Sequence, residues 1–334
     1  MAKKAVKLGI SVGISPRDTF GNMIDLIKKA EEYGFDSAWL IDIPTSKDCF
    51  IAMALAAINT QRIKLGSGVV NPITRHPAVS GRAHAAVQEL SQGRCMLGLG
   101  TGHTDVYLLG MKPAKIKEVE EAVTLLHKLF RGEEITNYGM KFRLAVSYDP
   151  IPIYLAANQP RMLRLAGRLC DGVILMGGAN VDFTRWQMEH VREGAEEAGR
   201  SLEDIAVDLW FPMSVSEDKQ KALRDIQPWA ASQAETFSRW KVLPEFLEPY
   251  REECARIGAA YNRSQHLSRH AAHKDLVSAD LANYLAIAGD AHECLDRLQE
   301  LASLEVHRMT IALLPGGRKE RLRTMSEKIL PALV

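Results

Sequence analysis

The stretch KLGSGVVNPITRHP, residues 64–77, contains a connection from a strand to a helix, the unit from which the fold can be predicted. Its apolar first half predicts a buried strand, and Pro77 is well suited to the first position of a following helix. Gly66 and Gly68 lie inside this strand, where glycine is unfavourable because it adds no side-chain packing and loses conformational freedom. We therefore expect another group to approach the backbone closely at this point.

The alternation of a short apolar run with an amphipathic helix repeats along the whole chain. The eight runs lie at residues 5–12, 37–42, 63–71, 95–102, 152–158, 172–178, 206–215 and 308–315. After the third run, the helical period predicts a buried face made of Val79, Ala83, Ala86 and Leu90. Continuous apolar strands separated by amphipathic helices indicate parallel strands that helices cover on the outside.

Eight such units predict an α/β fold, a (β/α)8 TIM barrel with insertions that forms one domain over residues 1–334. An open, doubly wound sheet is the alternative architecture. That sheet normally has a phosphate-binding glycine fingerprint after its first strand, where this chain reads ISVGISPRD. The barrel is therefore favoured.

Two insertions interrupt the repeat. Residues 133–150 predict a β-hairpin that turns at Tyr138 and Gly139. The largest insertion, residues 217–305 between the seventh and eighth strands, predicts a helical lid over the substrate, with Trp229 and Trp240 either in its wall or in a core.

Three histidines of this insertion, at positions 266, 270 and 273, have the spacing of one helix face. No carboxylate or cysteine completes a convincing ligand set around them, so we expect surface or lid histidines and no metal.

Composition excludes several classes of partner. The 334-residue chain is 46% hydrophobic and carries a formal net charge of +1, which gives no field to attract nucleic acid. No apolar run approaches the ~20 residues that span a bilayer, so we expect no membrane segment and a cytoplasmic protein. The five cysteines are widely spaced and predict buried thiols rather than disulfides or a zinc site.

The carboxyl ends of barrel strands normally carry the chemistry, and here they are rich in glycine and poor in titrating groups. They offer no lysine for a Schiff base and no carboxylate pair at glycosidase spacing. Such a mouth suits a bound cofactor that supplies its own reactivity. Backbone amides at the sequences GTG and GGAN could receive a phosphate, or these glycines could simply make tight turns.

Several segments, in this order, resemble the bacterial luciferase-like family of flavin- or deazaflavin-dependent oxidoreductases, and most closely its methylenetetrahydromethanopterin reductase branch. They are KLGISVG, AEEYGFDSAWLID, IKLGSGVVNPITRHP, ELSQGRCMLGLGTG, IPIYLAANQPRMLRLAGRLCDGVIL and IAGDAHECLDRLQEL. The resemblance implies an eight-stranded barrel that holds FMN or coenzyme F420. For the deazaflavin-using branch it also implies a non-prolyl cis peptide at the end of the third strand, here at Gly68–Val69.

The strand ends and the resemblance together define the expected site. Asp42 and His103 are the expected catalytic residues. The expected cofactor-binding residues are Ser67, Gly68, Val69, Asn71, Thr101, Gly102, Asn158, Met176, Gly177, Gly178 and Ala179. Ser11 stands where the pterin reductases have a glutamate, and Ile43 where the deazaflavin enzymes commonly have a histidine, so the pterin reaction is doubtful.

The resemblance therefore implies hydride transfer or monooxygenation of a small organic substrate. A methylenetetrahydropterin-type reductase and a barrel that binds a flavin or another ligand without turnover are the alternatives. The expected partners are the small-molecule substrate, a second copy of the chain in a homodimer, and a separate flavin reductase.

Overall fold

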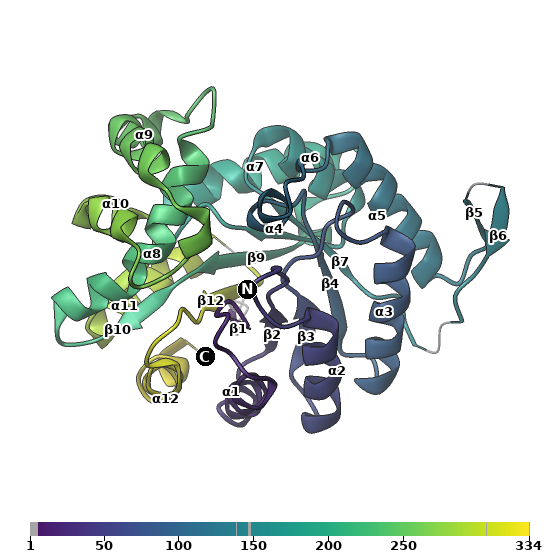
Figure 1. Cartoon of the computed structure of the whole chain (residues 1–334), viewed down its shortest axis with the longest axis horizontal. Coiled ribbons are helices and arrows are strands. Elements are labelled where there is room, and N and C mark those ends of the chain that lie inside the picture. The colour runs from purple at the N-terminus through teal and green to yellow at the C-terminus, as the bar shows by residue number, and fades with distance from the viewer. Residues whose placement is uncertain (1–5, 138, 146–147, 305, 334) are drawn as a thin grey trace. The chain divides into compact units, whose positions relative to one another are not determined.

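The computed structural model describes residues 6–137, 139–145, 148–304 and 306–333 (Figure 1). The chain divides into two compact units. The first unit consists of Gly9–Ile174 and Gln187–Val207, and the second unit consists of Met1–Leu8, Leu175–Trp186 and Asp208–Val334.

Eight parallel strands form a closed barrel in the order β1-β12-β9-β8-β7-β4-β3-β2, which confirms the predicted fold. They are β1 (Lys7–Val12), β2 (Ser37–Leu40), β3 (Lys64–Ser67), β4 (Cys95–Leu99), β7 (Ile153–Ala157), β8 (Gly172–Leu175), β9 (Ala206–Phe211) and β12 (Arg308–Ala312). Each predicted apolar run contains one of them, although Ala5, the start of the first run, lies outside the described residues. The observed strands are shorter because the last residues of most runs form the strand-to-helix loops.

Helices follow the strands of the first unit. They are α1 (Phe20–Glu32), α2 (Cys49–Asn59), α3 (Pro77–Leu90), α4 (Thr104–Leu108), α5 (Ile116–Phe130) and α6 (Pro160–Leu169), and α7 (Val181–Glu197) begins in the second unit. Thr19, Asp48 and His76 cap the first three of these helices through their side chains. Pro77 is the first residue of α3, as predicted, because its missing N–H has no partner at that position anyway.

The predicted buried face of α3 is wrong. Val79 is 51% exposed and Leu90 is 47% exposed, whereas the buried residues include Gly81, His84 and Gln88. Gly81 allows α3 to approach α5 closely, since a Cβ there would lie 3.2 Å from both Leu126 and Leu129. The buried face of α3 is determined by the close packing of a small residue and by the hydrogen bonds of polar residues. The periodicity of apolar residues shows neither of these contacts.

The predicted hairpin is present. Strands β5 (Ile135–Asn137) and β6 (Met140–Phe142) pair in antiparallel fashion. Tyr138, one of the two predicted turn residues, lies outside the described residues.

The run at residues 206–215 is not one strand, contrary to the prediction. It breaks at Pro212, which has no N–H for a sheet ladder, and the chain continues as β10 (Met213–Val215). Strand β10 pairs in parallel with β11 (Ile287–Gly289), a strand that the sequence did not reveal. The amide of Ile287 donates to the carbonyl of Pro212 over 3.2 Å, so the two strands meet at this break.

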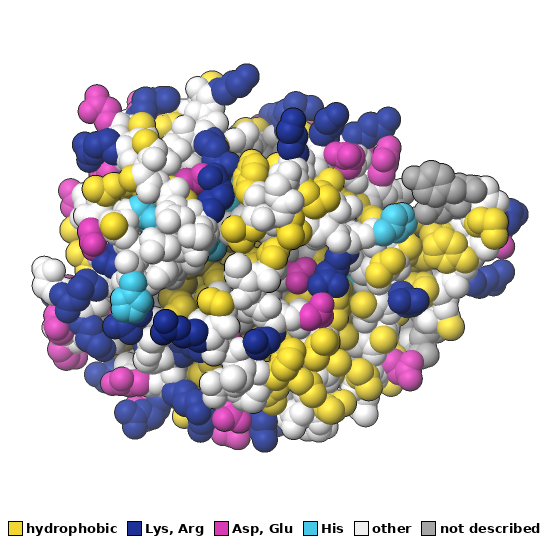
Figure 2. All heavy atoms as spheres, in the orientation of Figure 1, with side chains coloured by type: hydrophobic (Ala, Val, Ile, Leu, Met, Phe, Trp, Pro, Cys, Tyr) yellow, Lys and Arg dark blue, Asp and Glu magenta, His cyan; other side chains and the backbone are white. Residues whose placement is uncertain are grey.

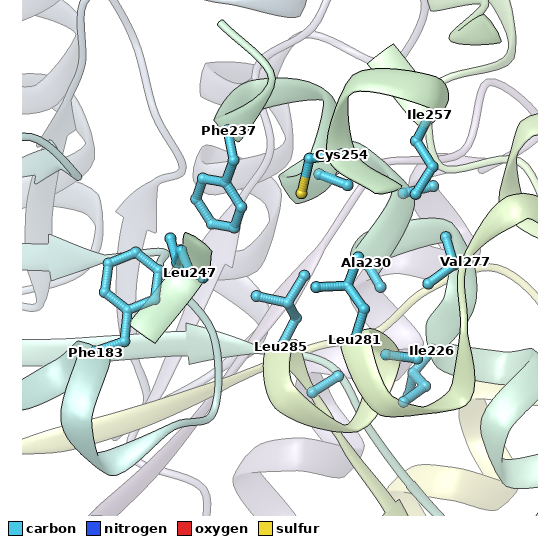
Figure 3. Close-up of a cluster of buried hydrophobic side chains, with 14 of the residues drawn as sticks. Phe183, Ile226, Ala230, Phe237, Leu247, Cys254, Ile257, Val277, Leu281 and Leu285 are labelled. Atoms are coloured by element: carbon cyan, nitrogen blue, oxygen red, sulfur yellow. The ribbon is translucent and has the colours of Figure 1, made fainter. Parts of the chain in front are cut away.

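Between β10 and β11 the chain is helical. The elements are α8 (Lys219–Phe237), η2 (Glu245–Tyr250), α9 (Arg251–Ala260), η3 (Arg263–Gln265), η4 (Ala272–Leu276) and α10 (Ala279–Leu285). Figure 3 shows side chains of α8, α9 and α10 pointing toward one another in a shared apolar core. Trp240 belongs to this core, whereas Trp229 is also buried but is not among its residues. The lid role of residues 217–305 stays a prediction, and Glu305 lies outside the described residues.

The histidines at 266, 270 and 273 do not share a helix face, which corrects the expectation from their spacing. His266 follows the short η3 turn, while His273 lies in η4, and no α-helix joins them. Among the described residues, no group of three histidines, cysteines or acidic residues could hold a metal ion. All five cysteines are free and buried, as predicted.

The remaining helices of the second unit are α11 (Ala291–Ala302), α12 (Arg318–Lys328) and α13 (Leu330–Leu333). In the described parts of the chain, we find no helix with the length and apolar character needed to span a membrane.

Candidate active site

The end of β3 forms a bulge against β4. Gly66 pairs with Met96, and the next paired position is Val70 with Leu99, so four steps along β3 match three along β4. The peptide bond between Gly68 and Val69 is cis, which confirms the expectation from the family resemblance. The Gly68 amide donates to the Leu40 carbonyl over 2.7 Å, which attaches the bulge to β2.

Neighbouring side chains explain several glycines at these strand ends. A Cβ on Gly66 would lie 2.2 Å from the indole ring of Trp39, so this ring is the group that approaches the β3 backbone there. Gly98 and Gly100 make room for the side chain of Val69, which lies 2.9 Å from the Cβ position of each. Part of the glycine pattern therefore serves packing rather than ligand access.

Asp42, at the end of β2, binds to Arg75 in the loop after β3. Arg75 Nε lies 3.3 Å from Asp42 Oδ2, and its Nη2 lies 2.7 Å from Asp48 Oδ2. The guanidinium also lies 5.1 Å from the centre of the Phe50 ring. Burial alone would raise the pKa of Asp48, but hydrogen bonds from Arg75 and from the first amides of α2 lower it below its ordinary value.

Asn71, just beyond the bulge, is only 1% exposed, and its amide group is fully engaged. Its Oδ1 accepts hydrogen bonds of 2.9 Å from the amides of Ile73 and Thr74, and its Nδ2 donates to the carboxylate of Asp105. Asp105 also accepts the His103 amide over 2.7 Å. Burial raises the pKa of Asp105, with a smaller contribution from the charge of Asp42.

Asp105 was not among the residues expected at this site. The only available signal was a carboxylate in the first turn after the GTGH strand end, and such residues usually cap a helix. Its link to Asn71 required the fold.

His103 comes after β4 with a half-buried ring. Its Nδ1 lies 3.2 Å from the Thr104 hydroxyl, and its ring meets that of Tyr107 edge-on at 5.6 Å. Thr101 and Gly102 directly precede it, and Gly102 has a φ of +81°, which favours glycine. Asn158, at the end of β7, accepts a hydrogen bond of 3.3 Å from Gln187.

Asp42, Asn71 and His103 come from the ends of three adjacent strands, but their bonds form two separate clusters. Arg75 binds Asp42, whereas Asp105 accepts hydrogen bonds from the Asn71 side chain and from the His103 amide. The side chain of Ser67, by contrast, is fully buried and faces His84 and Gly98.

Met176, Gly177, Gly178 and Ala179 follow β8 in the second unit. Gly178 has a φ of +124°, and a Cβ there would lie 2.8 Å from Leu285 Cα, so packing against α10 requires glycine. The Ala179 amide donates to Leu285, and its carbonyl accepts from Arg297 over 2.5 Å. This loop is held tightly within its own unit, and its predicted role toward a phosphate stays a prediction.

A closed parallel barrel with a bulged third strand and polar strand ends defines a class of α/β-barrel enzymes. The sequence profile of the family described as luciferase-like monooxygenase matches residues 6–308. The chain therefore belongs to the luciferase-like monooxygenase family and is an oxidoreductase.

Individual relatives support this assignment. A 5,10-methylenetetrahydromethanopterin reductase of Methanolobus tindarius is 28% identical over 313 residues, which cover 92% of this chain and 94% of the relative. An F420-dependent glucose-6-phosphate dehydrogenase of Nakamurella multipartita is 36% identical over 230 residues, covering 63% and 68% respectively. The solved structure of the coenzyme F420 dependent tetrahydromethanopterin reductase from Methanopyrus kandleri superposes with a TM-score of 0.83 at 25% identity, covering 99% of this chain and 100% of that one.

Proposed function

We propose that the chain is an oxidoreductase that uses F420 or FMN to act on a small organic substrate at the carboxyl ends of β2, β3 and β4. The bound cofactor would supply hydride transfer or, as FMN, dioxygen chemistry. The names of relatives that match the chain support F420-dependent hydride transfer as the first candidate. The family description supports monooxygenation with FMN as the second.

The bulge of β3 is the observation that carries this proposal. It moves residues 67–69 out of the ladder with β4 and leaves the half-buried Val69 side chain packed over Gly98 and Gly100. An apolar platform of this kind, bordered by a few polar side chains, fits a planar ring system. Thr101, His103 and Asn158 are the half-buried polar groups at the adjoining strand ends.

We assign proton transfer to His103 because its ring is half-buried at a strand end rather than enclosed in the core. Asp42 would have an orienting role rather than transfer a proton, because two nitrogen atoms of Arg75 donate hydrogen bonds to its carboxylate. Asp105 would fix the loop that carries His103, because it accepts the amide of that residue.

Two alternatives have less support. For a methylenetetrahydropterin-type reductase, Ser11 is the difficulty, because it is 5% exposed and its hydroxyl cannot replace a carboxyl group as an acid at neutral pH. A barrel that binds a cofactor without turnover remains the alternative from another functional class.

Titration of the purified protein with oxidised F420 and, separately, with FMN tests the proposal. We expect one of them to bind with a changed visible spectrum, and binding of neither would contradict the proposed function. The reduced form of the bound cofactor is then followed with a panel of carbonyl compounds, with and without air, using a flavin reductase to supply reduced FMN. Cofactor oxidation that requires a carbonyl compound indicates hydride transfer. Oxidation in air that places an oxygen atom of dioxygen in the substrate indicates oxygenation, whereas oxidation in air that yields only hydrogen peroxide does not.

The variant His103→Gln separates binding from turnover. We expect it to bind the cofactor like the wild type but to turn over at least about a hundredfold more slowly, within the usual range for loss of an acid–base group. Equal turnover by the variant would remove His103 from the proposal.

A further inference from the structure

Helix α3 has three buried polar side chains, and two of them, four residues apart, form hydrogen bonds with strands β3 and β4. Gln88, which is 6% exposed, accepts the Cys95 amide over 2.9 Å and donates to the Asp149 carbonyl over 3.0 Å. His84 is fully buried, and its ring packs edge-on against Phe50 at 4.9 Å. Gln88 thus binds the beginning of β4, whereas His84 is directed toward Ser67 at the end of β3.

The hydrogen bonds of His84 determine where its proton lies. Its Nδ1 is 2.8 Å from the carbonyl of Ser80, which can only accept, so Nδ1 carries hydrogen. Burial lowers the pKa of His84 to about 4, which leaves the ring neutral near pH 7. Nε2 is then an acceptor, and the Ser67 hydroxyl donates to it over 3.0 Å.

Ser67 in turn replaces a missing bond of the sheet. Its Oγ accepts the Gly98 amide over 3.1 Å, at the place where the bulge interrupts the backbone ladder between β3 and β4. Ser67 Oγ also lies 3.1 Å from the Gly98 carbonyl, but its one proton goes to His84, and that carbonyl accepts the Val70 amide over 3.0 Å. Hydrogen bonds therefore run in one direction from Gly98 through Ser67 to His84 and on to Ser80.

We infer that His84 is a positioning residue that acts through Ser67 to fix the β3 bulge. This inference rests on the proposed function, which assigns the bulge to the cofactor. His84 has no exposed surface with which to touch a cofactor itself, so its effect on binding passes through the placement of Ser67 and the residues after it. No other side chain bonds to the Ser67 hydroxyl among the described residues.

The test compares His84→Leu, His84→Gln and Ser67→Ala with Gln88→Leu as the matched control. The control also removes two hydrogen bonds from α3, one with the beginning of β4, at the opposite end from Gly98, and one with the Asp149 carbonyl before β7. The amide and carbonyl of glutamine can donate to Ser80 and accept from Ser67, so His84→Gln should restore what His84→Leu loses. The readouts are the dissociation constants and visible spectra of F420 and FMN, and hydrogen exchange of the peptide that contains Gly98 and Gly100.

We expect His84→Leu and Ser67→Ala to exchange faster at Gly98 and to bind the cofactor about tenfold more weakly, which corresponds to about 1.4 kcal/mol. Gln88→Leu should lower the unfolding temperature similarly but change the dissociation constant less than about twofold. His84→Gln should resemble the wild type, and if His84→Leu does not fold, His84→Gln and Ser67→Ala decide between the outcomes.

Unchanged exchange at Gly98, or unchanged cofactor affinity beside faster exchange, would overturn the inference. A wild-type protein that binds neither cofactor would instead contradict the proposed function. The exchange experiment would then decide alone whether His84 fixes the bulge.

Discussion

His84 and His266 connect stability to pH, because burial lowers the pKa of each to about 4. In the unfolded chain a histidine titrates near 6.5, so the unfolded state binds a proton first as the pH falls. Stability from these residues is complete above about pH 6.5 and decreases as the pH falls toward 4, by up to about 1.4 kcal/mol per pH unit for each histidine.

We therefore predict that His84→Gln makes the unfolding free energy less dependent on pH between about 7 and 5. The slope of the unfolding free energy against pH should decrease by up to about 1.4 kcal/mol per pH unit, which corresponds to one proton. The reason is that the variant has no group to titrate at this position. Urea unfolding of wild type and variant at several pH values measures this difference, and parallel curves would show that His84 does not titrate as described.

Gly66 is an example of a residue that stands out in the sequence although the sequence does not explain why glycine is needed there. Its position inside an apolar run indicates that another group approaches the backbone but does not say which group. The neighbour is the Trp39 ring, which comes from the adjacent strand. Only the register of β2 against β3 brings these residues together, and single-sequence patterns do not give that register.

We predict that Gly66→Ala lowers the unfolding free energy by about 2 kcal/mol, because the new methyl group would overlap the Trp39 ring. Gly21→Ala is the control, since Gly21 lies in α1 with no atom nearer than 3.9 Å to its Cβ position. The control should be neutral or slightly stabilising, as alanine favours helix. Chemical denaturation compares the two, and equal stability would contradict the packing account.

At the level of elements, the eight apolar runs located every barrel strand, because buried parallel strands are continuously apolar. The errors came from contacts between elements. The apolar run at residues 206–215 predicted one strand, but the strand ends before Pro212. The strand β11, which pairs with the chain beyond Pro212, is only three residues long. In the candidate site, the positions of Asp42, Asn71 and His103 at strand ends could be predicted, whereas Asp105 and His84 depend on tertiary hydrogen bonds.

Arg75 joins three elements of the first unit, and its replacement provides a prediction at this scale. Arg75→Met removes hydrogen bonds to Asp42 at the end of β2 and to Asp48 at the start of α2. We expect a loss of about 1–3 kcal/mol in unfolding free energy, since two partly buried carboxylates lose their partner. Arg75→Lys should recover part of the loss, because lysine keeps the charge without the fork geometry.

Lys117→Met is the control for Arg75, because Lys117 forms an ion pair with Glu121 in which both side chains are largely exposed. Its replacement should change stability by less than about 0.5 kcal/mol. Thermal unfolding of the three variants measures the differences, and a similar effect of Arg75→Met and Lys117→Met would show that Arg75 makes no special link.

On the scale of the whole molecule, the apolar stripe of α3 that was wrongly predicted to be buried is part of an exposed apolar surface. The apolar stripe Val79, Ala83, Ala86 and Leu90 is regular, yet it faces outward, and its two largest residues are 51% and 47% exposed. Neighbouring α2 exposes Ile51 by 52% and Ile58 by 60%. Figure 2 shows hydrophobic side chains gathered over the region where Figure 1 places these two helices. A contiguous apolar surface of this kind usually marks a protein interface.

We propose that α2 and α3 form the contact of a homodimer, in which the same face of each copy covers the other. We expect light scattering to give twice the chain mass of 37.1 kDa at micromolar concentration. Ile58→Glu and Val79→Glu should each yield monomers, because a buried unpaired charge opposes association. Met140→Glu, at a side chain that is 73% exposed on the hairpin strand β6, is the control and should leave the dimer intact. A monomeric wild type, or dimers that persist in both α2 and α3 variants, would show that this surface has another role.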